Sequence, residues 1–157
     1  MSTTPQRLEH LIDLGASLAP IHVAICHPVE SNMRSTIEAA ALCKMADRGQ
    51  ITGAIVDGPM AFDTAVSLEA ARIKGLVSAV AGTTDVLVVP DLESGNMLAK
   101  QLEYLASAKA AGIVLGARVP IILTSRADNT ETRLASCAVA VKLAHTRRHR
   151  TPGSLHA

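Results

Sequence analysis

The chain has 157 residues and a formal net charge of +1 at pH 7, and 48% of its residues are hydrophobic. That length predicts one domain of ordinary size with a real core. The near-neutral charge excludes an overall field for nucleic acid or a membrane surface. One Phe, one Tyr and no Trp leave no platform on which single-stranded nucleic acid could stack. We therefore expect neither nucleic acid nor a membrane as a partner.

The cysteines indicate a reducing compartment. Cys26, Cys43 and Cys137 are odd in number and widely spaced, and none forms a Cys-x-x-Cys pair. This pattern favours small buried apolar residues over a disulfide framework or a zinc site. The chain opens without a charged-then-apolar leader and has no apolar run of membrane-spanning length. We expect a cytoplasmic protein with no metal and no permanently bound cofactor.

Helical and extended segments alternate from the start of the chain. The predicted elements of the first half are helices over residues 5–18, 35–47 and 67–74 and strands over residues 21–26, 54–56 and 85–89. Ser35 and Glu38 fit a capping box, and the apolar run Ala39–Cys43 predicts burial. The strand at 85–89 is apolar at consecutive positions, as expected of a strand covered on both faces. This alternation predicts an α/β domain with a largely parallel sheet.

Polar residues follow three of these strands. His22 and His27 bracket the first strand, and a histidine at a strand end is usually solvated or hydrogen-bonded. Asp57-Gly58-Pro59 has turn chemistry. Asp91 follows the strand at 85–89, at the edge where open α/β sheets place ligand sites.

The last third begins with a helix whose core face carries Leu98, Leu102 and Leu105. Two β-prone runs, 112–115 and 119–124, then predict a hairpin or a bent strand. A further capping box at residues 128–131 opens an amphipathic helix, followed by a basic disordered tail from residue 147. The predicted core face of this last helix consists of Leu134, Cys137, Ala138, Val141 and His145.

Ser125 and Arg126 form the strongest local candidate for a site. They lie between a β-branched run and a predicted helix N-terminus, where free backbone N–H groups and the helix dipole favour an anion. A planar guanidinium suits a phosphate bidentately. The alternative is a surface arginine that pairs with Asp128 or Glu131.

Three stretches together resemble a known family. They are Met45–Asp63, with its Val-Asp-Gly-Pro; Val88–Asn96, with its Pro-Asp-Leu-Glu-Ser-Gly-Asn; and Gly116–Arg126, which ends in Thr-Ser-Arg. This combination is similar to the C-terminal half of the phosphate acetyl/butyryl transferases. The resemblance extends from about Gln6 to His145, and we take residues 6–146 as the corresponding domain after a disordered start at 1–5.

The resemblance implies an isocitrate/isopropylmalate-dehydrogenase-like fold, of which this chain holds a part. It also implies transfer of an acyl group between coenzyme A and inorganic phosphate, both as substrates. Ser125 and Arg126 would be catalytic, with the arginine holding the phosphate. The resemblance further implies a cleft between two α/β domains, with Ser125 and Arg126 in it. The candidate substrate-binding residues on the other side of this cleft are Asp57, Gly58, Pro59, Asp63, Asp91, Gly95 and Asn96. For Asp63 a local helix cap is the alternative.

The chain departs from the acetyl-specific members. They carry an aspartate base six residues after the arginine, where this chain has Thr132, and Asn-Asp where it has Ile122-Leu123. Both differences resemble the butyryl branch and leave the general base unassigned.

The N-terminal half of the family is also absent from the sequence. The resemblance therefore implies either an acyltransferase domain, as a homodimer or with a separate N-terminal half, or a non-catalytic module that dimerises. A gene fragment without independent function is the third interpretation.

Overall fold

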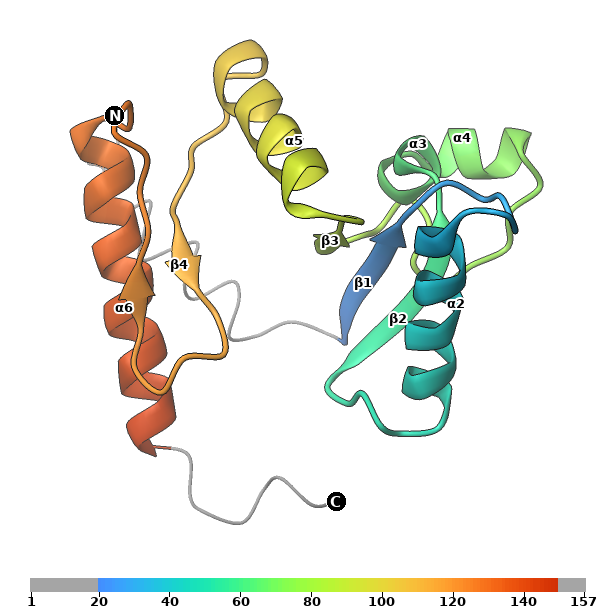
Figure 1. Cartoon of the computed structure of the whole chain (residues 1–157), viewed down its shortest axis with the longest axis horizontal. Coiled ribbons are helices and arrows are strands. Elements are labelled where there is room, and N and C mark those ends of the chain that lie inside the picture. Colours follow the sequence, from blue (N-terminus) through green and yellow to red (C-terminus); the bar gives the residue numbers. More distant parts are fainter. Residues whose placement is uncertain (1–19, 150–157) are drawn as a thin grey trace. The chain divides into compact units, whose positions relative to one another are not determined.

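The computed structural model describes residues 20–149, so the helix predicted over 5–18 and the end of the chain lie outside the described residues. The chain divides into two compact units, Met1–Leu98 and Ala99–Ala157. Each unit is described by itself (Figure 1).

The first unit is built on a three-stranded parallel sheet. Its strands are β1 (Ile21–Cys26), β2 (Ala54–Met60) and β3 (Val86–Val88). β1 lies in the middle and pairs in parallel with both neighbours, in the order β2-β1-β3. The parallel α/β arrangement predicted from the alternating pattern is confirmed.

Helices connect these strands across both faces of the sheet. α2 (Arg34–Asp47) links β1 to β2, and α3 (Phe62–Val66) and α4 (Leu68–Ile73) link β2 to β3. The connection from β1 to β2 and the connection from β2 to β3 run in opposite directions across the sheet. Because both connections are expected to be right-handed, α2 lies on one face of the sheet and α3 and α4 lie on the other. The core lies on the α3–α4 face and contains Ala24, Cys26, Met60, Ala65, Ala71, Val80 and Ala81. Side chains alternate along a strand, so Ile25 of β1 points to the α2 face.

Two expectations for α2 were wrong. The helix begins after Met33, which provides no side-chain cap, and Glu38 accepts a hydrogen bond from Arg34 at 2.6 Å instead of closing a capping box. Only Thr36 and Ala39 are buried in this helix. The apolar run therefore contributes one buried residue, because the sheet covers only one side of α2.

The Asp57-Gly58-Pro59 segment is part of β2, not a turn after it. The Gly58–Pro59 peptide is cis, and the pairing register with β1 shifts at this point. A Cβ at Gly58 would lie 2.8 Å from the carbonyl oxygen of Ile25. Glycine is required here because the backbones of the two strands approach so closely.

The apolar run at residues 85–89 predicted a strand covered on both faces, and this prediction was wrong. Val86 and Val88 are 43% and 36% exposed. β3 is an edge strand of the first unit, with β1 as its only partner among the described residues. Helix α5 (Leu92–Leu105) follows, and the boundary between the two units falls inside it. Its predicted core face is also wrong, since α5 has no buried residue.

The second unit combines a hairpin with a long helix (Figure 1). β4 (Ile113–Val114) and β5 (Ile121–Ile122) pair antiparallel, which confirms the hairpin and excludes the bent strand. α6 (Thr130–His149) packs against both strands.

The face of α6 that packs differs from the predicted one. Its buried residues are Thr132, Ser136 and Ala140, whereas Leu134 and Val141 are 63% and 69% exposed. This side of the helix can pack although it carries polar residues, because the buried Ser136 hydroxyl is bonded to the backbone. The helix also continues to His149, through the start of the tail predicted from residue 147.

Ser136 joins the helix to the hairpin and is fully buried. Its hydroxyl donates to the carbonyl of Thr132 at 2.7 Å and accepts the backbone N–H of Gly112 at 2.9 Å. Ser136→Ala leaves the Gly112 N–H without its acceptor, and we expect a loss of about 1–3 kcal/mol of unfolding free energy. Urea denaturation measures it. Thr146→Ala, which removes an exposed hydroxyl from the same helix, is the control, and equal losses in both variants would contradict the role of Ser136.

Candidate functional site

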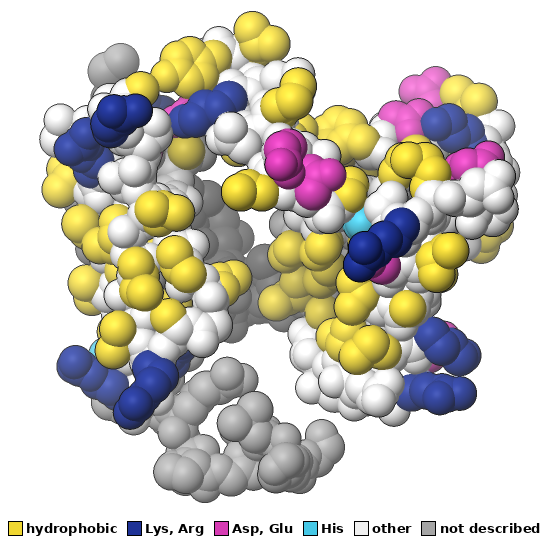
Figure 2. Space-filling view, in the orientation of Figure 1, with side chains coloured by type: hydrophobic (Ala, Val, Ile, Leu, Met, Phe, Trp, Pro, Cys, Tyr) yellow, Lys and Arg dark blue, Asp and Glu magenta, His cyan; other side chains and the backbone are white. Residues whose placement is uncertain are grey.

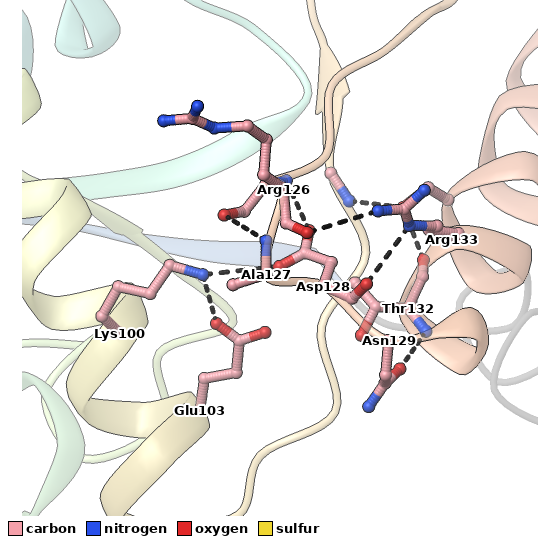
Figure 3. A network of polar contacts seen from close by, with 11 residues as sticks. Lys100, Glu103, Arg126, Ala127, Asp128, Asn129, Thr132 and Arg133 are labelled. Atoms are coloured by element: carbon pink, nitrogen blue, oxygen red, sulfur yellow. Dashed lines mark hydrogen bonds and ion pairs between the residues drawn. The ribbon is translucent and has the colours of Figure 1, made fainter.

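The Ser125–Arg126 loop is held in place by Asp128 (Figure 3). The Asp128 carboxylate accepts the backbone N–H of Ser125 at 2.6 Å, and the Asp128 N–H donates to the Ser125 carbonyl at 3.2 Å. Lys100 Nζ lies 3.5 Å from the second carboxylate oxygen. The Asp128 side chain is 9% exposed, so these contacts are shielded from solvent and fix the loop more firmly than surface contacts would.

The other side of the loop is held by the first turn of α6. Arg133 donates through Nε to the Asp128 carbonyl at 3.2 Å and through a terminal nitrogen to the Arg126 carbonyl at 3.4 Å. Asn129 caps the helix by accepting the N–H of Thr132 at 2.9 Å. The predicted capping box starting at Asp128 is therefore wrong by one residue, and Asp128 is available to hold the loop.

The guanidinium of Arg126 makes no ion pair or hydrogen bond within residues 20–149, and Figure 3 shows it extending away from the network. The two carboxylates that could have paired with it are engaged elsewhere. Asp128 holds Ser125 and Lys100, and Glu131 pairs with Lys109 at 2.5 Å. The alternative of a locally paired surface arginine is wrong. Arg126 is an exposed cation on a fixed backbone, as an anion-binding residue requires.

Thr132 is uncharged and occupies the position where the acetyl-specific members carry an aspartate. It is 8% exposed and lines a pocket of about 340 Å³ beside the C-terminal part of α5. Glu103, which also lines the pocket, pairs with Lys100 at 2.6 Å and raises the pKa of that lysine. A carboxylate is therefore present at the pocket although position 132 has none.

In the first unit, Asp57 and Asp63 make local contacts. Asp57 accepts the N–H of Gly58 at 2.8 Å. The pKa of the Cys43 thiol is raised to about 11, first by burial of the thiol and then by the negative charge of Asp57. Asp63 lies on α3, pairs with Lys74 at 2.6 Å and accepts the N–H of Thr64. The bond from Lys74 lowers the pKa of Asp63. These contacts agree with the local-cap alternative, and a substrate role for either aspartate stays a prediction.

Asp91, Gly95 and Asn96 lie at the start of α5, beyond the carboxyl end of β3. Asp91 caps the helix by accepting the Ser94 N–H at 2.7 Å. A Cβ on Gly95 would lie 3.0 Å from Val89, so the helix approaches the strand end closely. Asn96 is exposed.

His27 contradicts the expectation that a histidine at a strand end is solvated or hydrogen-bonded. It directly follows β1, is 6% exposed, and its Nδ1 is buried without a hydrogen-bond partner. The signal was its position after the central strand of the sheet. His22, at the other end of β1, is bonded to Thr83 at 3.0 Å.

The described residues contain no group of three or more His, Cys, Asp or Glu side chains that could hold a metal ion. The three cysteines are free, and Cys137 is exposed, against the expectation of burial. No helix in the described part of the chain is long and apolar enough to cross a membrane.

Comparison with known proteins decides the family. The model described as "Phosphate acetyl/butaryl transferase" matches residues 22–141. The chain belongs to this family. The match includes the Asp57–Pro59 segment, Asp91–Asn96 and the Ser125–Arg126 loop.

Individual relatives agree. A phosphate acetyltransferase from Rhizobium meliloti is 61% identical over 146 residues, which cover 90% of this chain and 46% of the relative. A phosphate butyryltransferase from Clostridium beijerinckii is 44% identical over 82% of this chain and 41% of its own length. The crystal structure of a branched-chain phosphotransacylase from Enterococcus faecalis superposes with a TM-score of 0.73 at 30% identity, over 91% of this chain and 55% of that one. The chain thus spans about half the length of the relatives it matches.

These identities do not favour the butyryl branch. The acetyltransferase shares more residues with this chain than the butyryltransferase does, although Ile122, Leu123 and Thr132 resemble the butyryl pattern. Those three positions are therefore too few to assign acyl-chain length.

The Asp91 cap gives a pH prediction. Hydrogen bonds from the Ser94 hydroxyl and N–H, and then the charge of His27, lower the pKa of Asp91 below its ordinary 3.8. The stability from this cap is therefore fully present above the unfolded pKa of about 3.9 and is lost as the pH falls through the lower folded value. In an NMR titration, we expect Ser94→Ala to move the Asp91 midpoint up towards 3.8 and the exposed control Ser31→Ala to leave it in place. An Asp91 midpoint at or above 3.8 in the unaltered chain would contradict the cap.

Proposed function

We propose that this chain acts in acyl transfer of the acetyl or butyryl type between coenzyme A and inorganic phosphate. The observation that carries the proposal is Arg126, an unpaired guanidinium on a loop fixed by Asp128, in a chain that belongs to this family. An arginine without a protein partner can bind a phosphate through two parallel N–H donors. The fixed backbone lowers the entropy cost of that binding.

The reaction requires the phosphate to be positioned and the departing sulfur to be stabilised. A phosphate oxygen attacks the thioester carbonyl, the carbon–sulfur bond breaks, and coenzyme A leaves as a thiolate that takes up a proton. Arg126 would hold the phosphate, and positioning of this kind contributes up to about 7–11 kcal/mol in ideal cases. The Ser125 hydroxyl would donate to the developing oxyanion or to the sulfur. In the reverse direction a base must remove the thiol proton.

The finer features belong to the same proposal. The fold would be part of the isocitrate/isopropylmalate-dehydrogenase-like arrangement of two α/β domains with a cleft, supported by the likeness to the E. faecalis phosphotransacylase. The candidate substrate-binding residues are Asp57, Gly58, Pro59, Asp63, Asp91, Gly95 and Asn96. The active form would be a cytoplasmic homodimer or would include a separate N-terminal half.

The test is release of coenzyme A thiol from acetyl-CoA or butyryl-CoA, measured with and without phosphate. We expect phosphate-dependent release that falls about 100-fold or more in Arg126→Ala, the size of effect known for one transition-state donor. Arg118→Ala, which removes another exposed arginine from the same unit, is the control and should keep the activity. An Arg126→Ala protein as active as the unaltered chain would refute the proposed role.

A non-catalytic module is the second candidate function. It is favoured by exposed apolar side chains of the second unit, which include Leu115, Val119, Leu123, Leu134 and Val141. Figure 2 shows hydrophobic side chains on the visible face of this unit. A module would show no turnover with either thioester and a stable dimer on a sizing column. Turnover that Arg126→Ala abolishes would exclude it.

A further inference from the structure

A buried histidine, His27, lies at the carboxyl edge of the parallel sheet, and its Nδ1 has no hydrogen-bond partner among residues 20–149. His27 continues β1 by donating its backbone N–H to Met60 at 3.1 Å. The register shift between Ala24 and Cys26 places the extra residue on β2, so side chains still alternate along β1. His27 comes two residues after Ile25, and we infer that both side chains face α2. An unpaired buried polar atom such as this Nδ1 is destabilising, and a ligand that bonds to it would relieve that penalty.

The N-terminus of α2 on that same face has free hydrogen-bond donors. Met33 gives no side-chain cap, and the first turn holds no acidic residue. Within the part of the chain that the structure describes, the backbone N–H groups of Arg34 and Ser35 have no acceptor. The 14-residue α5 also begins at this edge, but Asp91 already occupies its N-terminus. The α2 terminus is therefore the one of these two that attracts an anion.

The loop between β1 and α2 is preformed. The Thr36 hydroxyl donates to the Pro28 carbonyl and accepts the Glu30 N–H at 3.4 Å, so the loop is tied to the first turn of the helix. Arg34 uses only Nε for Glu38, and its side chain is 91% exposed, which leaves its terminal nitrogens available. A cation and free N–H groups at the start of α2 and an imidazole without a hydrogen-bond partner at the end of β1 thus belong to the first βα connection. In doubly wound sheets this is where phosphates bind.

We propose that the β1–α2 turn is a second phosphate-binding site, formed by His27, the backbone N–H groups of Arg34 and Ser35, and the Arg34 guanidinium. None of these groups belongs to the Ser125–Arg126 loop, and the proposal rests on the proposed function only for the source of its ligand. That source is either the diphosphate or ribose phosphate of coenzyme A, or inorganic phosphate. The shared chemistry is a tetrahedral oxyanion that accepts several hydrogen bonds.

The experiment uses the full chain with Arg126→Ala, so that the first candidate phosphate site is removed. Inorganic phosphate and coenzyme A are titrated separately at constant ionic strength, and the backbone amide resonances of Arg34 and Ser35 are followed by NMR. We expect saturable shifts with at least one of the two probes. Saturation with coenzyme A alone assigns the site to the cofactor's phosphates, and saturation with inorganic phosphate assigns it to the free ion. No saturable shift with either probe would overturn the proposal.

Two further variants, made in the same Arg126→Ala chain, test the named residues. His27→Gln should weaken binding at least tenfold, whereas His22→Gln, at the opposite end of β1, should leave it unchanged. Arg34→Ala alters a fully exposed side chain, so it reports on binding even if His27→Gln disturbs folding, and it should also weaken binding. Equal affinity in Arg34→Ala and the parent, or equal losses in the two histidine variants, would overturn the proposal. Because none of these readouts is activity, their failure is distinct from failure of acyl transfer.

Discussion

The bond between the Asp128 carboxylate and the backbone of Ser125 is the interaction on which the candidate site depends. It fixes the backbone that carries Arg126, and together with Lys100 it satisfies the carboxylate that would otherwise attract the guanidinium. A nearby carboxylate free to pair would compete with any anionic ligand. Asp128 therefore positions the backbone of Arg126 and, within residues 20–149, does not pair with its guanidinium.

The first unit meets the same requirement with different chemistry. Its three strands are parallel, so their carboxyl ends meet at one edge, and the helices that follow β1 and β3 start there. Asp91 caps one of these helices, whereas at the start of the other the N–H groups of Arg34 and Ser35 have no acceptor among the described residues. In both units the donors available to an anion are those that the chain's own carboxylates have left unused.

Local chemistry could be predicted from the sequence, but the burial of whole faces could not. The β1 strand, the α4 helix, the hairpin and the polar residues after β3 followed from periodicity and turn chemistry. The buried faces of α5 and α6 and the exposure of β3 could not be predicted. Hydrophobicity indicates which side chains can be buried, but it does not indicate which element packs against them. Asp57–Pro59 was misread because a close strand approach and a turn both require glycine. The burial of His27 was not predicted, because a nitrogen without a hydrogen-bond partner can be recognised only in the folded structure.

The most direct test of the central claim is whether phosphate binds the Arg126 guanidinium. The side-chain Nε–H resonance of Arg126 can be followed by NMR while phosphate is added to the full chain, with chloride at equal ionic strength as the reference. The account predicts a saturable shift with phosphate, none with chloride, and a weaker one in Asp128→Ala, where the loop is released. An Arg126 resonance that responds to neither ion, or equally to both, would contradict the account.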